Sequence, residues 1–577
     1  MRKMKIEADG NTKSSDVELG SEPGGLGRRD LFKKIGVGAG AAIAGLIISQ
    51  TTQAQEAAAQ RSQAPGPPTG PLAPDTGEGN QDWPKIRESH YFPSSGQPGY
   101  TTFAGPGWVN KSGRAFGNGP MDECSRRLTE YTSSFHVDYT DGFLEAFNYL
   151  MLASLADIYS GFESQPARIN SRLSQSMRGD MKCTVVGYGV VTTPEMAAFT
   201  NACMSRHADF NDHTNELLWG VLAIGEALHS TGPQVIDAMA VAYEVVAALD
   251  GAAGGAVGVA GSGGYDVMYH APATALACGK LMGLDKDQLA NALSLAIVPH
   301  IPLAVTHAGI LSMWKGNHSA EQVRNGVWAA LLASEGMTGP AEPFEGRDGV
   351  IQHVGPFGRD LRLPYSGDGR TAIETMHANG RGYKALPAVG SSVIYINTLL
   401  PQVVAWVKPE EVAAIEIHVN SVLWQEDADP PKFDPRSRET ADHSLMYITC
   451  RGIIDKYVYI DSFTYDKYMD PVVREMLQKV RTIPDAPPGP VIWTIRKKSG
   501  EEKSFSANAN TLLSHDDNVK RYNRMADFMQ IDKAQADRAR EQWMNLRAVK
   551  DIADAMQTIA KYGQPKPLSD KTRARWS

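Results

Sequence analysis

The sequence predicts a mainly α-helical protein with an inserted α+β domain, because the spacing of its apolar residues changes along the chain. From about residue 122 to 380 apolar residues recur at helical spacing. Between about 385 and 520 strand-like alternation appears among the helices, and residues 533–562 are helical again. We therefore expect a large helical domain at 121–380, a smaller α+β domain at 381–525, and a C-terminal return to the helical domain at 526–577.

Several helices of the first region have recognisable ends. We expect helices over Thr140–Ser160 and Pro233–Leu249, the second opening on a proline and ending before a glycine. Asp285–Gln288 and Ser319–Gln322 have the spacing of capping boxes that open helices, and the second of these helices should stop at Gly336.

The α+β region shows both kinds of element. Ile415–Val419 alternates as a half-buried strand does, and Ser499–Gly500 lies between two strand-like runs as in a hairpin. Those runs are Val491–Ile495 and Lys503–Ser506. Helices are expected over Thr440–Ile454 and Pro471–Val480.

The first 120 residues do not have the pattern of a packed domain. Paired arginines at 28 and 29 precede Leu31-Phe32-Lys33 and the apolar run Ile35–Ser49, an order that resembles a twin-arginine signal peptide ending near Ala54. We expect export and a periplasmic or extracellular location, with no membrane contact beyond the signal. The alternatives are an uncleaved N-terminal anchor and a chance junction of basic and apolar residues. Residues 55–120, rich in Pro, Gly and Gln, indicate an arm or linker.

The charge and the cysteine content argue against several classes of partner and cofactor. The net charge of −8 and the lack of a long basic run argue against nucleic acid as a partner. The five cysteines are scattered, without a CxxC pair, so neither a zinc site nor an iron–sulfur cluster is indicated. An odd number in an exported chain allows one or two disulfides without specifying any.

A dense group of polar residues lies between Arg206 and Thr214, within otherwise apolar helical sequence. It contains His207, Asp209, Asp212 and His213, and single polar residues interrupt later apolar runs at His270, Lys315 and Lys384. Buried acids, imidazoles and amines suit proton transfer, because burial and neighbours tune their pKa values.

These residues stand in motifs that resemble the MmgE/PrpD family over roughly residues 125–565. The motifs are Asp209-Phe210-Asn211-Asp212, His270 after a Gly-rich stretch, Gly283-Leu284-Asp285, Lys315 ahead of Asn325-Gly326-Val327, Gly336-Met337-Thr338-Gly339-Pro340, Tyr383-Lys384-Ala385-Leu386-Pro387, and Arg438 to Tyr447. The last is most similar to the 2-methylcitrate dehydratase branch.

The resemblance implies a helical domain with a smaller lid domain, an active site in the cleft between them, a homodimer, and neither a metal nor another cofactor. It places catalytic residues at Asp209, His270, Lys315, Lys384 and Tyr447. The family commonly has a His-Pro pair after this first motif, whereas this chain reads Asn215 to Gly220 without either residue. His213 is the candidate that supplies the missing imidazole.

Elimination of water from a hydroxy-acid needs a base, an acid and cations that hold carboxylates. His270 or Asp209 could act as the base, Tyr447 or a histidine as the acid, and Lys315 and Lys384 as carboxylate ligands. The candidates for substrate contact are His207, Asp212, Arg438 and His443.

Each of these residues also has a structural interpretation. Asp209 and Asp212 could cap a helix, and Lys315 could lie on the neighbouring Trp314 ring. Tyr447 could be an ordinary core tyrosine, and Arg438 and His443 could be ion-pair partners of Glu439 and Asp442.

Three alternative functions are compatible with this sequence. The first is a PrpD-like lyase that hydrates or dehydrates a small hydroxy-tricarboxylate such as 2-methylcitrate. The second is a decarboxylase or epimerase of the same family acting on another polycarboxylate. The third is an exported protein that binds a carboxylate without catalysis.

Overall fold

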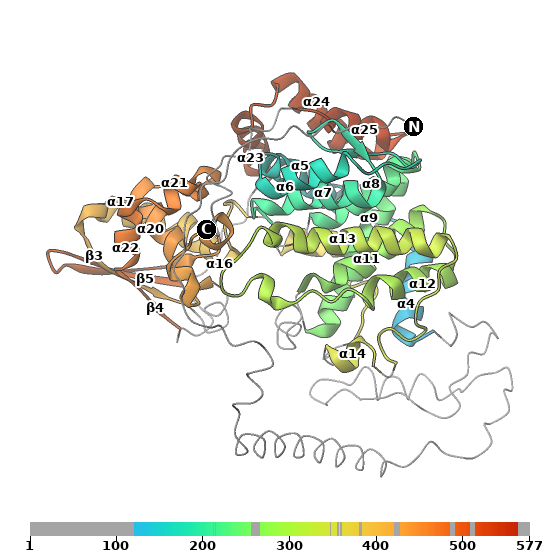
Figure 1. Ribbon diagram of the computed structural model, residues 1–577, viewed down its shortest axis with the longest axis horizontal. Coiled ribbons are helices and arrows are strands. Elements are labelled where there is room, and N and C mark those ends of the chain that lie inside the picture. Colours follow the sequence, from blue (N-terminus) through green and yellow to red (C-terminus); the bar gives the residue numbers. More distant parts are fainter. Residues whose placement is uncertain are drawn as a thin grey trace, which may run out of the picture. The chain divides into compact units, whose positions relative to one another are not determined.

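The computed structural model describes residues 121–562 except for 212, 214, 255–265, 347, 355–356, 358–359, 380–383, 420–426, 485–490 and 508–513 (Figure 1). The expected signal peptide, the arm at 55–120 and Asp212 lie outside the described residues. None of the helices within them combines the length and the apolar character that a bilayer crossing requires.

The helical region contains nine longer helices among the described residues, followed by two short ones. They are α4 (Glu123–Ser134), α5 (Asp141–Gly161), α6 (Gln165–Ser174), α7 (Pro194–His207), α8 (Glu216–Ala227), α9 (Gly232–Ala253), α11 (His270–Leu281), α12 (Lys286–Ile297), α13 (Trp314–Ser334), α14 (Val350–His353) and α15 (Ala372–Ala378). A two-stranded hairpin, β1 (Cys183–Val185) and β2 (Val190–Thr192), lies between α6 and α7. Helix α13 packs against α7 and α11, and these contacts form the framework of the site.

Local sequence explains where several of these helices begin. Thr140 caps α5 by accepting the N–H of Phe143, and Asp285 forms the expected capping box with Gln288 at the start of α12. Helix α9 opens with Pro233 in its first turn but runs four residues beyond the expected end, to Ala253, and is followed by Gly254 in a left-handed conformation. Gly251 lies inside this helix, where a Cβ would come within 2.9 Å of the Tyr365 ring. Packing therefore explains this glycine better than helix termination.

The expected helix start at Ser319 is wrong. Helix α13 begins five residues earlier, at Trp314, and ends as expected before Gly336. The Ser319 hydroxyl is buried and donates to the Glu216 carboxylate at 3.2 Å. The spacing that resembles a capping box thus belongs to a helix interior, and it places Lys315 in the first turn of α13.

The smaller region combines a four-stranded sheet with helices. Its elements are α16 (Gly390–Ile394), a π-helical turn η3 (Tyr395–Leu399), α17 (Leu400–Trp406), β3 (Val412–His418), α19 (Arg438–Ala441), α20 (Leu445–Asp455), α21 (Tyr465–Tyr468), α22 (Pro471–Leu477), β4 (Val480–Ile483), β5 (Val491–Lys497) and β6 (Glu502–Ala507). The strand order is β4-β3-β5-β6, with β3 parallel to β4 and antiparallel to β5. The hairpin expected at Ser499–Gly500 is confirmed, and Gly500 has the positive φ that such a turn requires. The region has its own core, in which Ile415 and Ile417 pack with Trp493 and the helices α17, α20 and α22.

The single helix expected over Thr440–Ile454 is interrupted. Helix α19 ends at Ala441, and α20 starts at Leu445 after Ser444, whose hydroxyl accepts the N–H of Tyr447. Such a serine restarts a helix because it satisfies an otherwise unpaired N–H of the first turn. The break contains Asp442 and His443.

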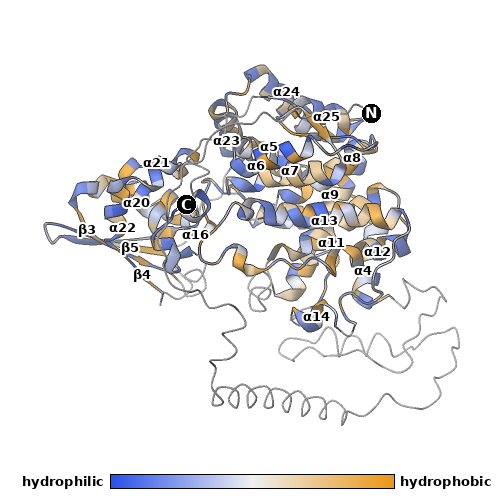
Figure 2. Cartoon of the chain, in the orientation of Figure 1, coloured by the Kyte–Doolittle hydropathy of each residue, from blue (hydrophilic) through white to orange (hydrophobic). Residues whose placement is uncertain are grey.

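The last helices return to the helical region, as the sequence indicates. They are α23 (His515–Phe528), α24 (Lys533–Met544) and α25 (Ile552–Ile559), so the helical pattern at 533–562 is divided in two. Helix α23 packs on α5, where the hydroxyls of Tyr522 and Tyr159 are 3.3 Å apart. The apolar character of the buried α8 and α9 contrasts with the more polar α24 in Figure 2. All five cysteines are buried free thiols.

Candidate active site

Asp209 is the central carboxylate of the site, and it lies two residues after the end of α7. Its φ of 64° is left-handed, a conformation that Asp and Asn adopt more readily than most residues. The side chain is fully buried and accepts a hydrogen bond from the Arg206 guanidinium. The turn thus directs a carboxylate into the interior beside the cation that compensates its charge.

Two lysines approach this carboxylate from distant parts of the chain. Nζ of Lys384 is 3.2 Å from one oxygen of Asp209, and Nζ of Lys315 is 3.9 Å from the other. The backbone N–H of Lys384 also donates to the Phe210 carbonyl at 2.9 Å, which fixes its segment beside the motif. The structure therefore brings together the three residues that the sequence motifs singled out.

The break between α19 and α20 supplies a second acid and an imidazole. One oxygen of Asp442 accepts from Nζ of Lys315 at 2.7 Å and lies 2.9 Å from Nδ1 of His443. The other oxygen accepts from Arg438 at 2.9 Å. Arg438 also donates to the carbonyl of His207, so the predicted residues of both regions form one polar network.

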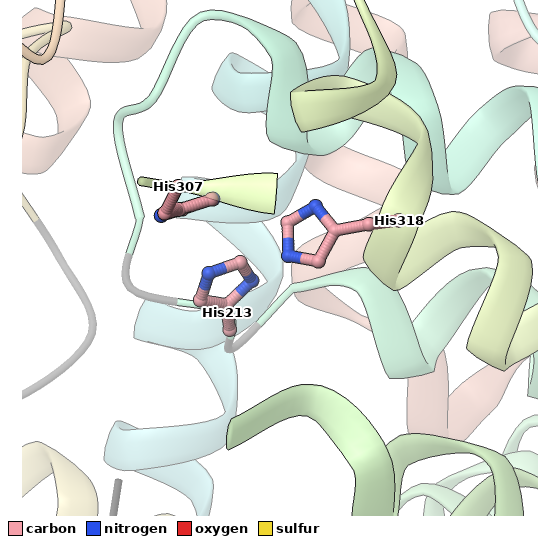
Figure 3. Close-up of side chains that lie close together, drawn as sticks. All are labelled: His213, His307 and His318. Carbon is pink, nitrogen blue, oxygen red and sulfur yellow. The ribbon is translucent and has the colours of Figure 1, made fainter. Parts of the chain in front are cut away.

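Three further imidazoles meet beside this network. His213, His307 and His318 each present a ring nitrogen, and these nitrogens lie within 4.8 Å of one another (Figure 3). Nε2 of His270 is 2.9 Å from the carbonyl of His213, and the ring centroids of His307 and His443 are 4.9 Å apart. His213, which the sequence placed in the site, therefore lies beside two histidines that were not predicted, His307 and His318.

His318 had a usable signal in the sequence. It stands three residues after Lys315 on one helix, so both side chains lie on the same face of α13. His307 lies just after the short 3₁₀ turn Ala304–Thr306, and no periodicity marks it.

Glu216 and Arg206 hold His213 from two sides. Nδ1 of His213 is 3.2 Å from Oε1 of Glu216, and Nε2 is 3.3 Å from a guanidinium nitrogen of Arg206. Glu216 is fully buried and also accepts from Ser319, so α13 and α8 are connected at this point.

Burial dominates the ionisation of the site. It lowers the pKa of His270 to about 4 and lowers the pKa values of His213, His307, His318 and His443 well below that of free histidine. It also lowers the pKa of Lys315, an effect that the Asp442 carboxylate opposes. The site therefore offers neutral imidazole nitrogens within a framework of paired charges.

Tyr447 is not brought to this cluster. It is buried in the core of the smaller region, where its hydroxyl donates to the Ser462 carbonyl at 2.5 Å and its ring packs beside Phe463. Burial raises its pKa far above that of free tyrosine. These contacts match the structural interpretation of this residue.

A pocket of about 520 Å³ opens beside the polar network. Its lining includes His207, Arg438, Phe463 and Tyr468, and the acidic side chains of Glu163 and Glu439. Arg438 lines this pocket and also donates to Asp442, so it connects the pocket with the buried network.

The fold is that of a helical protein with a smaller α+β region, and a buried network of paired charges connects the two regions. The chain belongs to the MmgE/PrpD family: residues 126–358 match the MmgE/PrpD N-terminal domain, and residues 397–488 match the C-terminal domain. The resemblance seen in the motifs is therefore confirmed.

The curated proteins to which the chain is similar include cis-aconitate decarboxylases. The chain is 28% identical to the enzyme of Aspergillus terreus over 246 residues. This aligned segment covers 40% of this chain and 48% of that enzyme. The chain is 23% identical to the human enzyme over 365 residues. That aligned segment covers 59% of this chain and 72% of the human enzyme. The chain thus spans about half the length of the fungal relative.

Proposed function

We propose that this protein is a lyase that acts on a small tricarboxylate by acid–base chemistry, with decarboxylation of a substrate like cis-aconitate as its first candidate reaction. The observation that carries this proposal is the convergence of Lys315 and Lys384 on Asp209 and Asp442, next to His443. The relatives named above favour decarboxylation.

The cations suit the carboxylates of such a substrate. An ammonium group has three N–H donors, and Nζ of Lys315 has one carboxylate at 2.7 Å and another at 3.9 Å. A substrate carboxylate can share this donor, while Arg438 meets a second carboxylate from the pocket. Two such contacts orient the reacting carbon atoms.

The reaction then needs one proton transfer. In a decarboxylation, the bond between carbon and one carboxylate breaks, CO₂ leaves, and the electron pair that remains is taken up as carbon is protonated. His443 is placed to carry that proton, because Asp442 holds its Nδ1 at 2.9 Å and so orients the ring. The lysines stabilise the negative charge that develops on the remaining carboxylates.

Dehydration of 2-methylcitrate is the second candidate. The segment from Arg438 to Tyr447 resembles the 2-methylcitrate dehydratase branch, and three of its residues, Arg438, Asp442 and His443, enter the polar network. In this reaction a base removes a proton next to a carboxylate, and an acid protonates the hydroxyl that leaves as water.

Proton NMR of the purified protein in deuterated water distinguishes the reactions. With cis-aconitate, new methylene signals and release of CO₂ identify a decarboxylase. With 2-methylcitrate, collapse of the methyl doublet to a singlet, as the neighbouring C–H is lost and a C=C bond forms, identifies a dehydratase. Exchange of a C–H for deuterium without a new product identifies an epimerase.

The His443→Gln variant should be inactive in whichever reaction is found, while His377→Gln, outside the polar network, should keep full activity. A folded protein that leaves every tested substrate unchanged contradicts the proposal and favours the non-catalytic carboxylate-binding protein.

The proposal includes export by the twin-arginine route and a homodimeric state. Cell fractionation, with the two signal arginines replaced by lysines as the control, tests the first. The mass of the purified protein in solution tests the second.

A further inference from the structure

We propose that His213, His307 and His318 form a binding site for one divalent transition-metal ion, with Zn²⁺ as the simplest occupant. The three side chains come from different segments, after α7, after the turn η2 (Ala304–Thr306) and from α13, and point toward a common space (Figure 3). Their donor nitrogens lie within 4.8 Å of one another. Two imidazole nitrogens on one zinc ion stand roughly 3.3 to 4.2 Å apart, so the rings need to move by only about 1 Å.

Two of the rings are already oriented as metal ligands usually are. Nδ1 of His318 is 2.6 Å from the carbonyl of Lys315, so in the neutral ring it carries the hydrogen and Nε2 keeps the lone pair. Nδ1 of His213 faces the Glu216 carboxylate at 3.2 Å in the same way. A carbonyl or carboxylate that holds the second ring nitrogen fixes the tautomer and strengthens the ligand.

The donor set also selects the kind of ion. Three imidazoles suit Zn²⁺, Co²⁺, Ni²⁺ or Fe²⁺, whereas Mg²⁺ and Ca²⁺ prefer oxygen ligands. His307 and His318 are buried, and His213 is half-buried. A three-histidine site also leaves a coordination position for water or a carboxylate.

Arg206 competes with the ion. Its guanidinium nitrogen is 3.3 Å from Nε2 of His213, the lone pair that an ion would use. The same guanidinium contacts Asp209 and lies 3.7 Å from Glu216, so both carboxylates can hold it when His213 turns to a metal. Metal binding should therefore move Arg206 toward these acids.

A bound ion would have a direct consequence for the chemistry, if the proposed function holds. The His307 and His443 rings are 4.9 Å apart, so the ion would lie next to the proposed proton carrier and could take a substrate carboxylate as its fourth ligand. The metal site itself is tested by binding, which does not depend on activity.

The experiment uses the full chain without a polyhistidine tag, stripped with a chelator and titrated with Zn²⁺ or Co²⁺. Calorimetry should give one Zn²⁺ per chain, and Co²⁺ should give the visible absorption of a low-coordinate nitrogen site, while Mg²⁺ should not bind. Loss of a partner outside the ligand shell commonly costs 10- to 100-fold in affinity, so His307→Ala and His318→Ala should each weaken binding by at least about 100-fold.

His300→Ala is the matched control, because His300 lies on the same segment as His307 but outside the trio. It should bind Zn²⁺ like the unaltered protein. Absence of stoichiometric binding, or binding that survives both His307→Ala and His318→Ala, overturns the proposal.

X-ray absorption at the zinc edge tests the site without any variant, which matters where a substitution prevents folding. The loaded protein should show three imidazole ligands. A shell of sulfur atoms, or of oxygen atoms alone, contradicts the assignment.

Discussion

Nζ of Lys315 donates to Oδ1 of Asp442 at 2.7 Å, and both side chains are buried. The lysine is in the first turn of α13, and the aspartate lies in the break between α19 and α20. This hydrogen bond therefore joins the helical region to the smaller region at the proposed reaction centre.

Replacement of Lys315 by alanine should abolish turnover and change stability little. Without Lys315, the Asp442 carboxylate still has a nitrogen of Arg438 and a nitrogen of His443 at 2.9 Å each, so its negative charge stays compensated. The loss should therefore be smaller than the roughly 3–5 kcal/mol expected for an unpaired buried charge. Activity assays and chemical denaturation measure both effects. Lys280→Ala, which removes an amine that serves only two backbone carbonyls among its described contacts, is the control and should remain active.

Asp209 should respond differently to two substitutions. Asp209→Asn keeps a side chain that tolerates the left-handed backbone but removes the charge between Arg206 and Lys384, so activity should fall at least about 100-fold. Asp209→Ala should in addition be less stable than Asp209→Asn by about 1 kcal/mol, because alanine is strained at this φ. Equal denaturation midpoints for the two variants would show that the backbone here relaxes.

Tyr447→Phe should leave the reaction running at a rate within a few-fold of normal. Its hydroxyl donates to the Ser462 carbonyl, and this buried bond should be worth about 1–3 kcal/mol once its partner is left unsatisfied. The expected result is a lower denaturation midpoint with turnover retained. A well-folded but inactive variant would instead restore Tyr447 as the acid suggested by the sequence.

Gly326→Ala should loosen the helix pair that carries the site. A Cβ at this position would lie 2.5 Å from the Ala271 carbonyl oxygen and 2.5 Å from Cβ of Thr274, both on α11. Helix α13 must then move away from α11, at a cost of about 1–3 kcal/mol. We expect a lower melting temperature together with weaker substrate binding, since Lys315 and His270 lie on these two helices. Gly336→Ala, with open space around its Cβ, should affect stability only through its positive φ.

Glu226 should make stability depend on pH. Burial raises its pKa above the free value of 4.5, although Thr184 donates to it from both its N–H and its hydroxyl. The folded state then holds this proton more tightly than the unfolded chain. The stability contributed by the protonated form is complete below pH 4.5 and is lost as pH rises through the folded pKa. Urea denaturation should show the unaltered protein losing stability relative to Glu226→Gln as pH increases. A difference between the two that stays constant with pH would contradict the raised pKa.

The structural features that could be predicted from the sequence are those that interactions between neighbouring residues determine. The cap at Thr140, the capping box at Asp285 and the turn at Gly500 follow from side-chain and backbone preferences within a few residues. The motif around Asp209 and the lysines at 315 and 384 were recognised as a set, and the structure brings them together. Their catalytic roles stay predictions.

The remaining features depend on contacts that no local pattern contains. Ser319 has the spacing of a cap, but its hydroxyl serves Glu216, 103 positions away in the chain. The convergence of His307 with His213 requires distant segments of the helical region to be folded on one another, and Lys315 meets Asp442 only once the two regions are in contact. His307 therefore carried no usable signal until the helices had been placed.

The pairing of α5 with α23 affects how the protein is made. Helix α5 leaves the ribosome early, yet the helix that covers it through Tyr522 is synthesised more than 350 residues later. Until then the nascent chain exposes an apolar helix surface, which favours aggregation and recruits chaperones. Completion of this core must wait for the end of translation, so synonymous codon changes that slow elongation between the two helices should lower the yield of soluble protein.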